Sequence, residues 1–198
     1  MTASGAHELV VIGASWGGLD ALRSLLRALP GDLDATVAVA QHRAPESHPT
    51  AFRDLLGAVT VLDVSDAHDK EPLRRGTVFL APPDYHLLVE GEHFALSTEA
   101  AVSFSRPSVD VLFESAAEAA RERCVGVVLT GANDDGARGL ARIRELGGAA
   151  IVQDPATAER YEMPRAAVKA VPDAHVLPLD EIAGALTALC GTGKVARV

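Results

Sequence analysis

The sequence predicts an α/β protein with a three-layer, doubly wound fold and a mostly parallel sheet. Two observations support this fold class. Short β-branched runs alternate along the chain with segments that carry leucine and alanine at helical spacing, as expected for parallel strands joined by crossover helices. Residues 77–97 interrupt this alternation with three short apolar runs separated by proline-, glycine- and aspartate-containing turns, which predicts an inserted antiparallel β-meander.

Each predicted element follows from a local pattern. Runs of Val, Ile, Ala and Leu that are short enough for buried strands lie at residues 9–14, 36–41, 59–64, 125–130, 149–153 and 174–177. Apolar residues at helical spacing lie between these runs, at residues 19–29, 48–56, 108–121, 137–146, 164–170 and 179–189. The expected meander contains residues 78–81, 86–89 and 93–96.

Composition restricts both the domain organisation and the partners. The 198 residues, 48% of them hydrophobic, suffice for one sizeable core, so we expect one domain over residues 1–198 with a core at about 9–189. The net charge of −9 argues against nucleic acid as a partner, because binding to phosphates requires a basic surface. Neither Cys124 nor Cys190 shows ligand or redox spacing, and the chain has neither a leader pattern nor a long apolar run. We therefore expect a cytoplasmic protein without direct membrane insertion.

The most informative motif is a serine between the first strand and the first helix. Gly13 and Gly17 frame Ser15 in a G-x-S-x-G pattern, which allows a tight turn that lifts the hydroxyl above the sheet. A serine in this position can act as a nucleophile. The same run also fits a phosphate- or dinucleotide-binding turn, or a helix start with Ser15 as the N-cap.

Two further reactive side chains follow predicted strands. His42 comes directly after the second strand, and Asp134 and Asp135 follow the strand at 125–130. Since the carboxyl ends of parallel strands meet at one edge of the sheet, these residues and Ser15 can converge there. A serine, a histidine and a carboxylate together provide a nucleophile, its base and the group that orients the base. Taken singly, His42 could be a structural histidine, and the aspartates could cap the following helix.

Five motifs, in order along the chain, resemble the catalytic domain of the bacterial chemotaxis protein-glutamate methylesterases, the CheB family. They are Gly13-Ala14-Ser15-x-Gly17-Gly18, Gln41-His42, Arg106-Pro107-Ser108-Val109-Asp110-Val111-Leu112-Phe113, Leu129-Thr130-Gly131 with Asp135-Gly136-Ala137, and Met163-Pro164-Arg165. The order Ser, His, Asp differs from that of the α/β-hydrolases.

This resemblance implies a serine hydrolase that needs neither a metal nor an organic cofactor. Ser15 would be the nucleophile, His42 the base and Asp135 the triad acid. The implied reaction is hydrolysis of glutamate γ-methyl esters on helices of chemoreceptors or other signalling proteins, with release of methanol, and deamidation of glutamine at the same sites. Backbone amides near Ser15-Trp16 and Gly131-Ala132 are the candidate oxyanion donors.

The chain departs from the family pattern in three ways. Trp16 stands where the family commonly has threonine, and Ala132 where it has methionine, so we expect an indole to reshape the pocket. The first catalytic strand begins at about Leu9, which predicts a standalone catalytic domain without the receiver domain that family members often carry.

The acidic receptor helix that the resemblance implies would meet an acidic enzyme, so local basic contacts would have to supply attraction. Candidates are Arg106, Arg138 and Arg165, although each could instead pair with a nearby carboxylate.

Two alternatives belong to other functional classes. A dinucleotide-binding domain would need glycine in place of Ser15 and an acidic residue at the end of the second strand, where the chain has Gln41 and His42. A non-catalytic interaction module could keep the fold and have lost turnover. The oligomeric state does not follow from the sequence.

Overall fold

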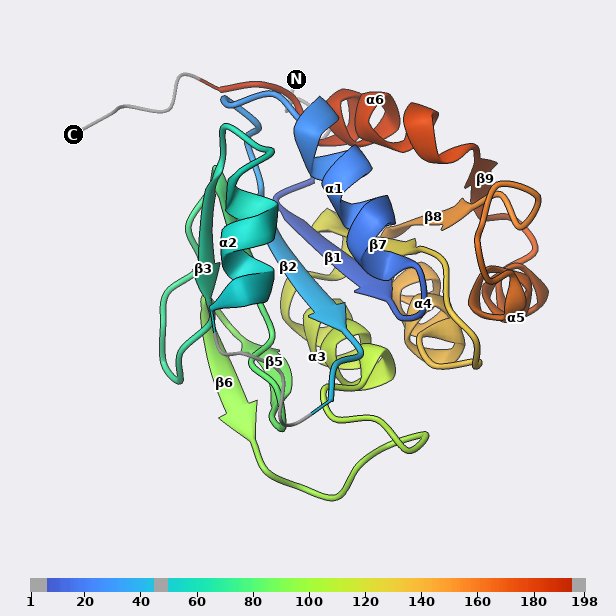
Figure 1. Ribbon diagram of the computed structural model, residues 1–198, viewed down its shortest axis with the longest axis horizontal. Coiled ribbons are helices and arrows are strands. Elements are labelled where there is room, and N and C mark those ends of the chain that lie inside the picture. Colours follow the sequence, from blue (N-terminus) through green and yellow to red (C-terminus); the bar gives the residue numbers. More distant parts are fainter. Residues whose placement is uncertain (1–6, 45–49, 194–198) are drawn as a thin grey trace.

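A parallel seven-stranded sheet forms the centre of the computed structural model, which describes residues 7–44 and 50–193 (Figure 1). The strand order is β3-β4-β2-β1-β7-β8-β9, and every neighbouring pair is parallel. Its strands are β1 (Leu9–Ala14), β2 (Thr36–Gln41), β3 (Asp63–Asp66), β4 (Thr77–Leu80), β7 (Cys124–Val128), β8 (Ala149–Gln153) and β9 (His175–Leu177). A separate antiparallel hairpin consists of β5 (His86–Glu90) and β6 (His93–Ser97).

Helices cover both faces of the sheet (Figure 1). On one face, α1 (Gly18–Ala28) contacts α2 (Ala51–Gly57) and α6 (Leu179–Cys190). On the other face, α4 (Ala137–Glu145) lies between α3 (Val109–Ala120) and α5 (Glu162–Ala170), and the hairpin strand β5 packs against α3. The short 3-10 helix η1 (Arg121–Arg123) leads into β7.

Two apolar clusters, one on each face of the sheet, form the core. Along β1, Val10 and Ile12 belong to the cluster under α1, whereas Leu9 and Val11 belong to the cluster under α3. All four side chains are buried. Burial on both faces explains why the central strands read as continuous apolar runs, since a parallel sheet covered by helices has no solvated face.

One strand of the expected meander lies elsewhere. The sequence predicts that residues 78–81 pair with the antiparallel segments, but this run forms β4 (Thr77–Leu80), a parallel strand of the main sheet between β2 and β3. Its residues are buried on both faces, with Phe79 in one apolar cluster and Val78 and Leu80 in the other. The inserted antiparallel unit is therefore a two-stranded hairpin.

Two predicted elements begin three or four residues later than expected. The strand expected at 59–64 is β3 at Asp63–Asp66, an edge strand with three polar residues, which a search for apolar runs misses. The helix expected at 48–56 is α2, which begins at Ala51, and residues 48–49 lie outside the described residues.

The topology brings the carboxyl ends of three strands together. The chain leaves β1 through α1 on one face and reaches β2, and it returns through α3 on the other face and reaches β7. The order of strands therefore reverses at β1, where open α/β sheets form their ligand crevice. Ser15, His42 and Asp135 follow β1, β2 and β7 at this edge.

Candidate active site

Ser15 occupies a turn that is fixed at both ends. Its N–H donates to the carbonyl of Thr130 (2.9 Å), and its own carbonyl accepts from the N–H of Gly18 (2.9 Å). The N-cap of α1 is Gly17, with φ of 75° and no side-chain cap hydrogen bond. The left-handed backbone at Gly17 suits glycine. Ser15 is therefore not the N-cap, and its hydroxyl is directed to His42 instead.

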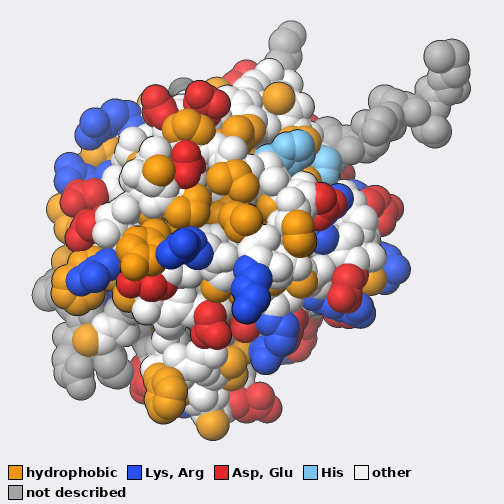
Figure 2. Space-filling model, turned by 90° about the vertical axis from the view of Figure 1, so that its right-hand side faces the viewer, with side chains coloured by type: hydrophobic (Ala, Val, Ile, Leu, Met, Phe, Trp, Pro, Cys, Tyr) orange, Lys and Arg blue, Asp and Glu red, His pale blue; other side chains and the backbone are white. Residues whose placement is uncertain are grey.

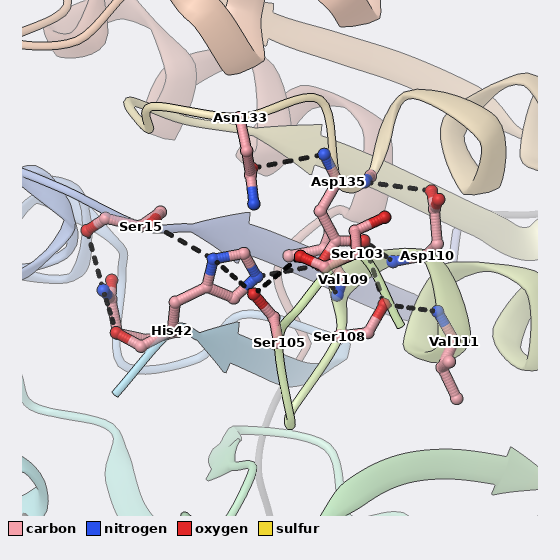
Figure 3. Close-up of polar contacts among 12 residues, drawn as sticks. Ser15, His42, Ser103, Ser105, Ser108, Val109, Asp110, Val111, Asn133 and Asp135 are labelled. Carbon is pink, nitrogen blue, oxygen red and sulfur yellow. Dashed lines mark hydrogen bonds and ion pairs between the residues drawn. The ribbon is translucent and has the colours of Figure 1, made fainter. Parts of the chain in front are cut away.

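His42 connects the serine with the carboxylate (Figure 3). Its Nδ1 lies 3.1 Å from Ser15 Oγ, and its Nε2 lies 2.8 Å from Asp135 Oδ2. Because a carboxylate accepts hydrogen bonds, Nε2 carries the proton and the lone pair of Nδ1 faces the serine. The imidazole is thus oriented to accept the hydroxyl proton of Ser15.

Asp135 is held in place by donors from the start of α3 as well as by His42. Its side chain is fully buried and accepts hydrogen bonds from Ser108 Oγ (2.9 Å) and from the backbone N–H groups of Val109 (2.8 Å) and Asp110 (2.9 Å). Burial by itself would raise the pKa of Asp135, but the hydrogen bonds from His42 and from the Asp110 and Val109 amides hold this pKa below its ordinary value. Asp135 is therefore an anion that faces the imidazole.

Asp134, the neighbour of Asp135, takes no part in this arrangement. Its side chain is exposed, and its backbone carbonyl accepts from the N–H of Ala137 (3.2 Å). The N-cap of α4 is Gly136, with no side-chain cap hydrogen bond. The alternative in which these aspartates cap α4 with their side chains is therefore wrong.

The sequence prediction assigned no role in the site to three polar residues near His42. Gln41 donates its Nε2 hydrogens to the carbonyls of Ser15 (2.7 Å) and His42 (3.1 Å), so it ties the two turns together. Ser105 Oγ lies 3.4 Å from His42 Nδ1, and the Asn133 side chain accepts from the N–H of Asp135 (3.2 Å). Gln41 could have been recognised, because it ends β2 at the same sheet edge. Ser105 and Asn133 depend on loop conformations that no sequence pattern indicates.

Trp16 lies on the rim of the site rather than within a closed pocket. The indole is 60% exposed, and its Nε1 donates to Glu159 Oε1 (2.9 Å). The backbone N–H groups of Trp16 and Ala132 have no acceptor among the described residues. They are therefore free to donate to a bound substrate.

A groove of about 520 Å³ is lined by His42 and Ser105. Its wall includes Phe104, whose side chain is fully exposed, and Arg106, which pairs with Asp84 (2.5 Å).

Over the described ranges 7–44 and 50–193, no group of three or more His, Cys, Asp or Glu side chains is arranged to hold a metal ion. None of the helices in that part of the chain is long and apolar enough to cross a membrane.

Comparison with known proteins gives consistent matches. The CheB methylesterase family matches residues 10–186. The chain is 44% identical over 178 residues to a Leptospira interrogans protein provisionally named protein-glutamate methylesterase/protein-glutamine glutaminase, with 89% of this chain and 92% of that protein covered. It is 46% identical over 183 residues to protein-glutamate methylesterase/protein-glutamine glutaminase 2 of Anaeromyxobacter dehalogenans, of which it spans 53%.

The crystal structure of the Thermotoga maritima CheB methylesterase catalytic domain has the same fold. The TM-score is 0.88 at 31% identity, with 94% of this chain and 100% of that domain covered. This match confirms the α/β fold with its mostly parallel sheet and inserted antiparallel unit.

Proposed function

The chain belongs to the CheB methylesterase family, and on this premise we propose that it is a protein-glutamate methylesterase that also deamidates glutamine. One observation carries the proposal. Ser15 Oγ, the His42 imidazole and the Asp135 carboxylate form a continuous hydrogen-bonded row, with separations of 3.1 and 2.8 Å, at the reversal point of the sheet. We propose Ser15 as nucleophile, His42 as base and Asp135 as the orienting acid.

The first half of the reaction forms an ester on Ser15. Oγ attacks the γ-carbonyl carbon of the methylated glutamate while His42 Nδ1 takes the hydroxyl proton. Asp135 stabilises the imidazolium that results, because its buried carboxylate stays ionised beside Nε2. Nδ1 then gives the proton to the departing methoxide, which leaves as methanol. With a glutamine substrate the same step releases ammonia.

The second half restores the enzyme. Water attacks the acyl group on Ser15, His42 takes a proton from this water, and the proton returns to Ser15 Oγ as the ester bond breaks. The product is a glutamate carboxylate on the substrate protein. In both halves the N–H groups of Trp16 and Ala132 are the donors that we propose for the oxyanion.

The two alternative functions gain no support. In a dinucleotide-binding domain, the turn after β1 would face a pyrophosphate and the end of β2 would supply an acid for the ribose. Here the serine hydroxyl faces an imidazole, and Gln41 binds backbone carbonyls. A module that had lost turnover would have no need for a buried, ionised carboxylate aligned with that imidazole.

We propose that the partners are methylated helices of chemoreceptors or related signalling proteins. The cytoplasmic location and the single domain expected from the sequence remain predictions.

The proposal is tested by incubating the protein with a methylated receptor signalling fragment and measuring released methanol. We expect methanol in proportion to the loss of methyl groups from glutamate, as read by mass spectrometry of the fragment. A fragment that stays fully methylated, although the protein is folded by circular dichroism, would contradict the proposed activity.

A further inference from the structure

Two arginines beside the site lack an acidic partner. Within residues 7–44 and 50–193, no carboxylate forms an ion pair with Arg160 or Arg165, and both side chains are exposed. The other candidate arginines are already paired, Arg106 with Asp84 and Arg138 with Glu114. Arg160 and Arg165 are therefore free to bind carboxylates that the protein does not itself supply.

Each of these guanidinium groups lies over an exposed aromatic ring. Arg160 lies 5.3 Å from the centre of the Trp16 ring, and Arg165 lies 5.2 Å from that of Tyr161. The rings are 60% and 48% exposed. This cation–π contact restrains each guanidinium group and leaves its N–H donors open to a carboxylate. Figure 2 shows the side of the molecule that carries α5, where basic side chains lie next to exposed hydrophobic ones.

Backbone contacts attach these residues to the strand ends that form the site. The hydroxyl of Thr130 accepts from the N–H of Arg160 (2.9 Å) and lies 2.9 Å from the carbonyl of Trp16. The N–H of Gly131 donates to the carbonyl of Arg160 (3.1 Å). Because Trp16 directly follows Ser15, the backbone of Arg160 is held at a fixed position relative to the proposed nucleophile. Arg165 follows in the first turn of α5, where its N–H donates to the carbonyl of Tyr161 (2.9 Å).

The nearby acidic residues do not form ion pairs with the two arginines. The Glu159 carboxylate accepts from the indole of Trp16, and Glu162 is half-buried, with Oε2 inaccessible. Neither forms an ion pair with Arg160 or Arg165.

We propose that Trp16, Arg160, Tyr161 and Arg165, here called the arginine–aromatic patch, bind carboxylates of an acidic helix in the substrate protein. This inference rests on the proposed function, since each turnover of that reaction leaves a carboxylate on the substrate. Side chains three or four residues from the reacting glutamate lie on the same helix face, so their carboxylates reach the patch while the ester lies at Ser15. Because the whole protein carries a net charge of −9, attraction for such a helix has to be local.

The test uses two synthetic helical peptides, each with one glutamate γ-methyl ester. One peptide carries glutamate three, four and seven residues from the ester, and the other carries alanine at those positions. Binding is measured on a Ser15→Ala background through the fluorescence of Trp16, the only tryptophan in the sequence. The variants are the Arg160→Gln/Arg165→Gln pair and the control Arg27→Gln, which removes an exposed arginine in the last turn of α1.

We expect the acidic peptide to bind about three- to tenfold more tightly than the neutral one, the range that two exposed charge pairs provide, and added salt to reduce this preference. The double arginine variant should lose the preference and Arg27→Gln should keep it. Equal binding of the two peptides, or a preference that survives in the double variant, would overturn the proposal.

Methanol release from the same peptides, measured with Ser15 intact, separates this inference from the proposed function. Charge-selective binding without methanol would contradict the esterase activity alone. Equal methanol release from both peptides would contradict the arginine–aromatic patch alone.

Discussion

Asp135, which precedes α4, binds the amino terminus of α3, and Asp110, in the first turn of α3, binds the amino terminus of α4. Asp135, just before α4, accepts from the N–H of Asp110 in the first turn of α3 (2.9 Å). Asp110 in turn accepts from the N–H groups of Gly136 (2.9 Å) and Gly139 (2.8 Å) at the start of α4. Helix amino termini present unpaired N–H groups and the positive end of the helix dipole. This exchange fixes α3 against α4 and thereby sets the position of Asp135 relative to His42.

The first prediction separates the adjacent aspartates. Asp135→Asn should lower turnover by up to about 10⁴-fold, because the amide no longer stabilises the imidazolium or favours the tautomer in which Nε2 carries the proton. Asp134→Asn should keep turnover within about twofold and stability within about 0.5 kcal/mol, since that side chain is exposed and makes no cap. Methanol release rates and urea unfolding of both variants provide the measurement. Loss of turnover in Asp134→Asn with retention in Asp135→Asn would reverse the assignment.

The second prediction concerns pH and Asp110. Burial raises the pKa of Asp110, and the negative charge of Asp135 raises it further. An acid whose pKa is raised by folding binds its proton more tightly in the folded protein, so its contribution to stability falls as pH rises from about 4 through the raised pKa. Asparagine does not ionise, so Asp110→Asn removes this loss of stability with rising pH. The stability of the variant relative to the original protein should therefore increase with pH across that window.

Urea unfolding midpoints measured from about pH 4 to 7 test this sign. A stability difference that stays constant, or that moves against the variant as pH rises, would contradict it. The contribution of Asp135 to stability depends on pH with the opposite sign. Because its pKa is lowered, the stability that it contributes is present above about pH 4 and is lost as the pH falls through the lowered pKa.

The third prediction treats Gln41 as a positioning residue. Gln41→Glu places carboxylate oxygens against the carbonyls of Ser15 and His42, where the native amide donates at 2.7 and 3.1 Å. We expect kcat to fall by about 10- to 100-fold through displacement of the two turns, with little change in KM. Gln41→Met, which keeps the volume without a carboxylate, should retain more activity than Gln41→Glu. A rise in KM alone, or equal kcat values for both variants, would argue against positioning.

The fourth prediction compares two glycines. A Cβ on Gly13 would lie 2.1 Å from Cγ1 of Val109, whose N–H binds Asp135, so Gly13→Ala should cost about 1–3 kcal/mol and reduce turnover. A Cβ on Gly184 in α6 meets nothing within 4 Å, so Gly184→Ala should stabilise the protein by about 0.5–1 kcal/mol and leave turnover unchanged. Thermal unfolding of both variants measures the contrast. Equal shifts in Tm would contradict it.

Much of the fold could be predicted from local patterns. The strands β1, β2, β7 and β8 read as apolar runs because helices bury both of their faces. The proximity of Ser15, His42 and Asp135 could be predicted because each follows such a strand, and the carboxyl ends of parallel strands lie at one edge of the sheet. Their catalytic roles remain predictions.

Other features depended on packing between distant segments. The polar edge strand β3 is specified by its pairing with β4 rather than by an apolar run. The donors to Asp135 come from the amino terminus of α3, so their role depends on how α3 packs against the turn before α4. Trp16 was expected to reshape the pocket, but its orientation follows from Glu159, 143 residues further along the chain.

The central claim is that His42 activates Ser15, and a second serine makes this claim sharply testable. Ser105 Oγ lies 3.4 Å from the same His42 Nδ1 that lies 3.1 Å from Ser15 Oγ. The most direct measurement is covalent labelling with a fluorophosphonate, which reacts with activated serines, followed by peptide mass spectrometry. We expect label on Ser15 that is lost in a folded His42→Gln variant and retained in Ser105→Ala. Label on Ser105, or label on Ser15 that persists without His42, would contradict the account.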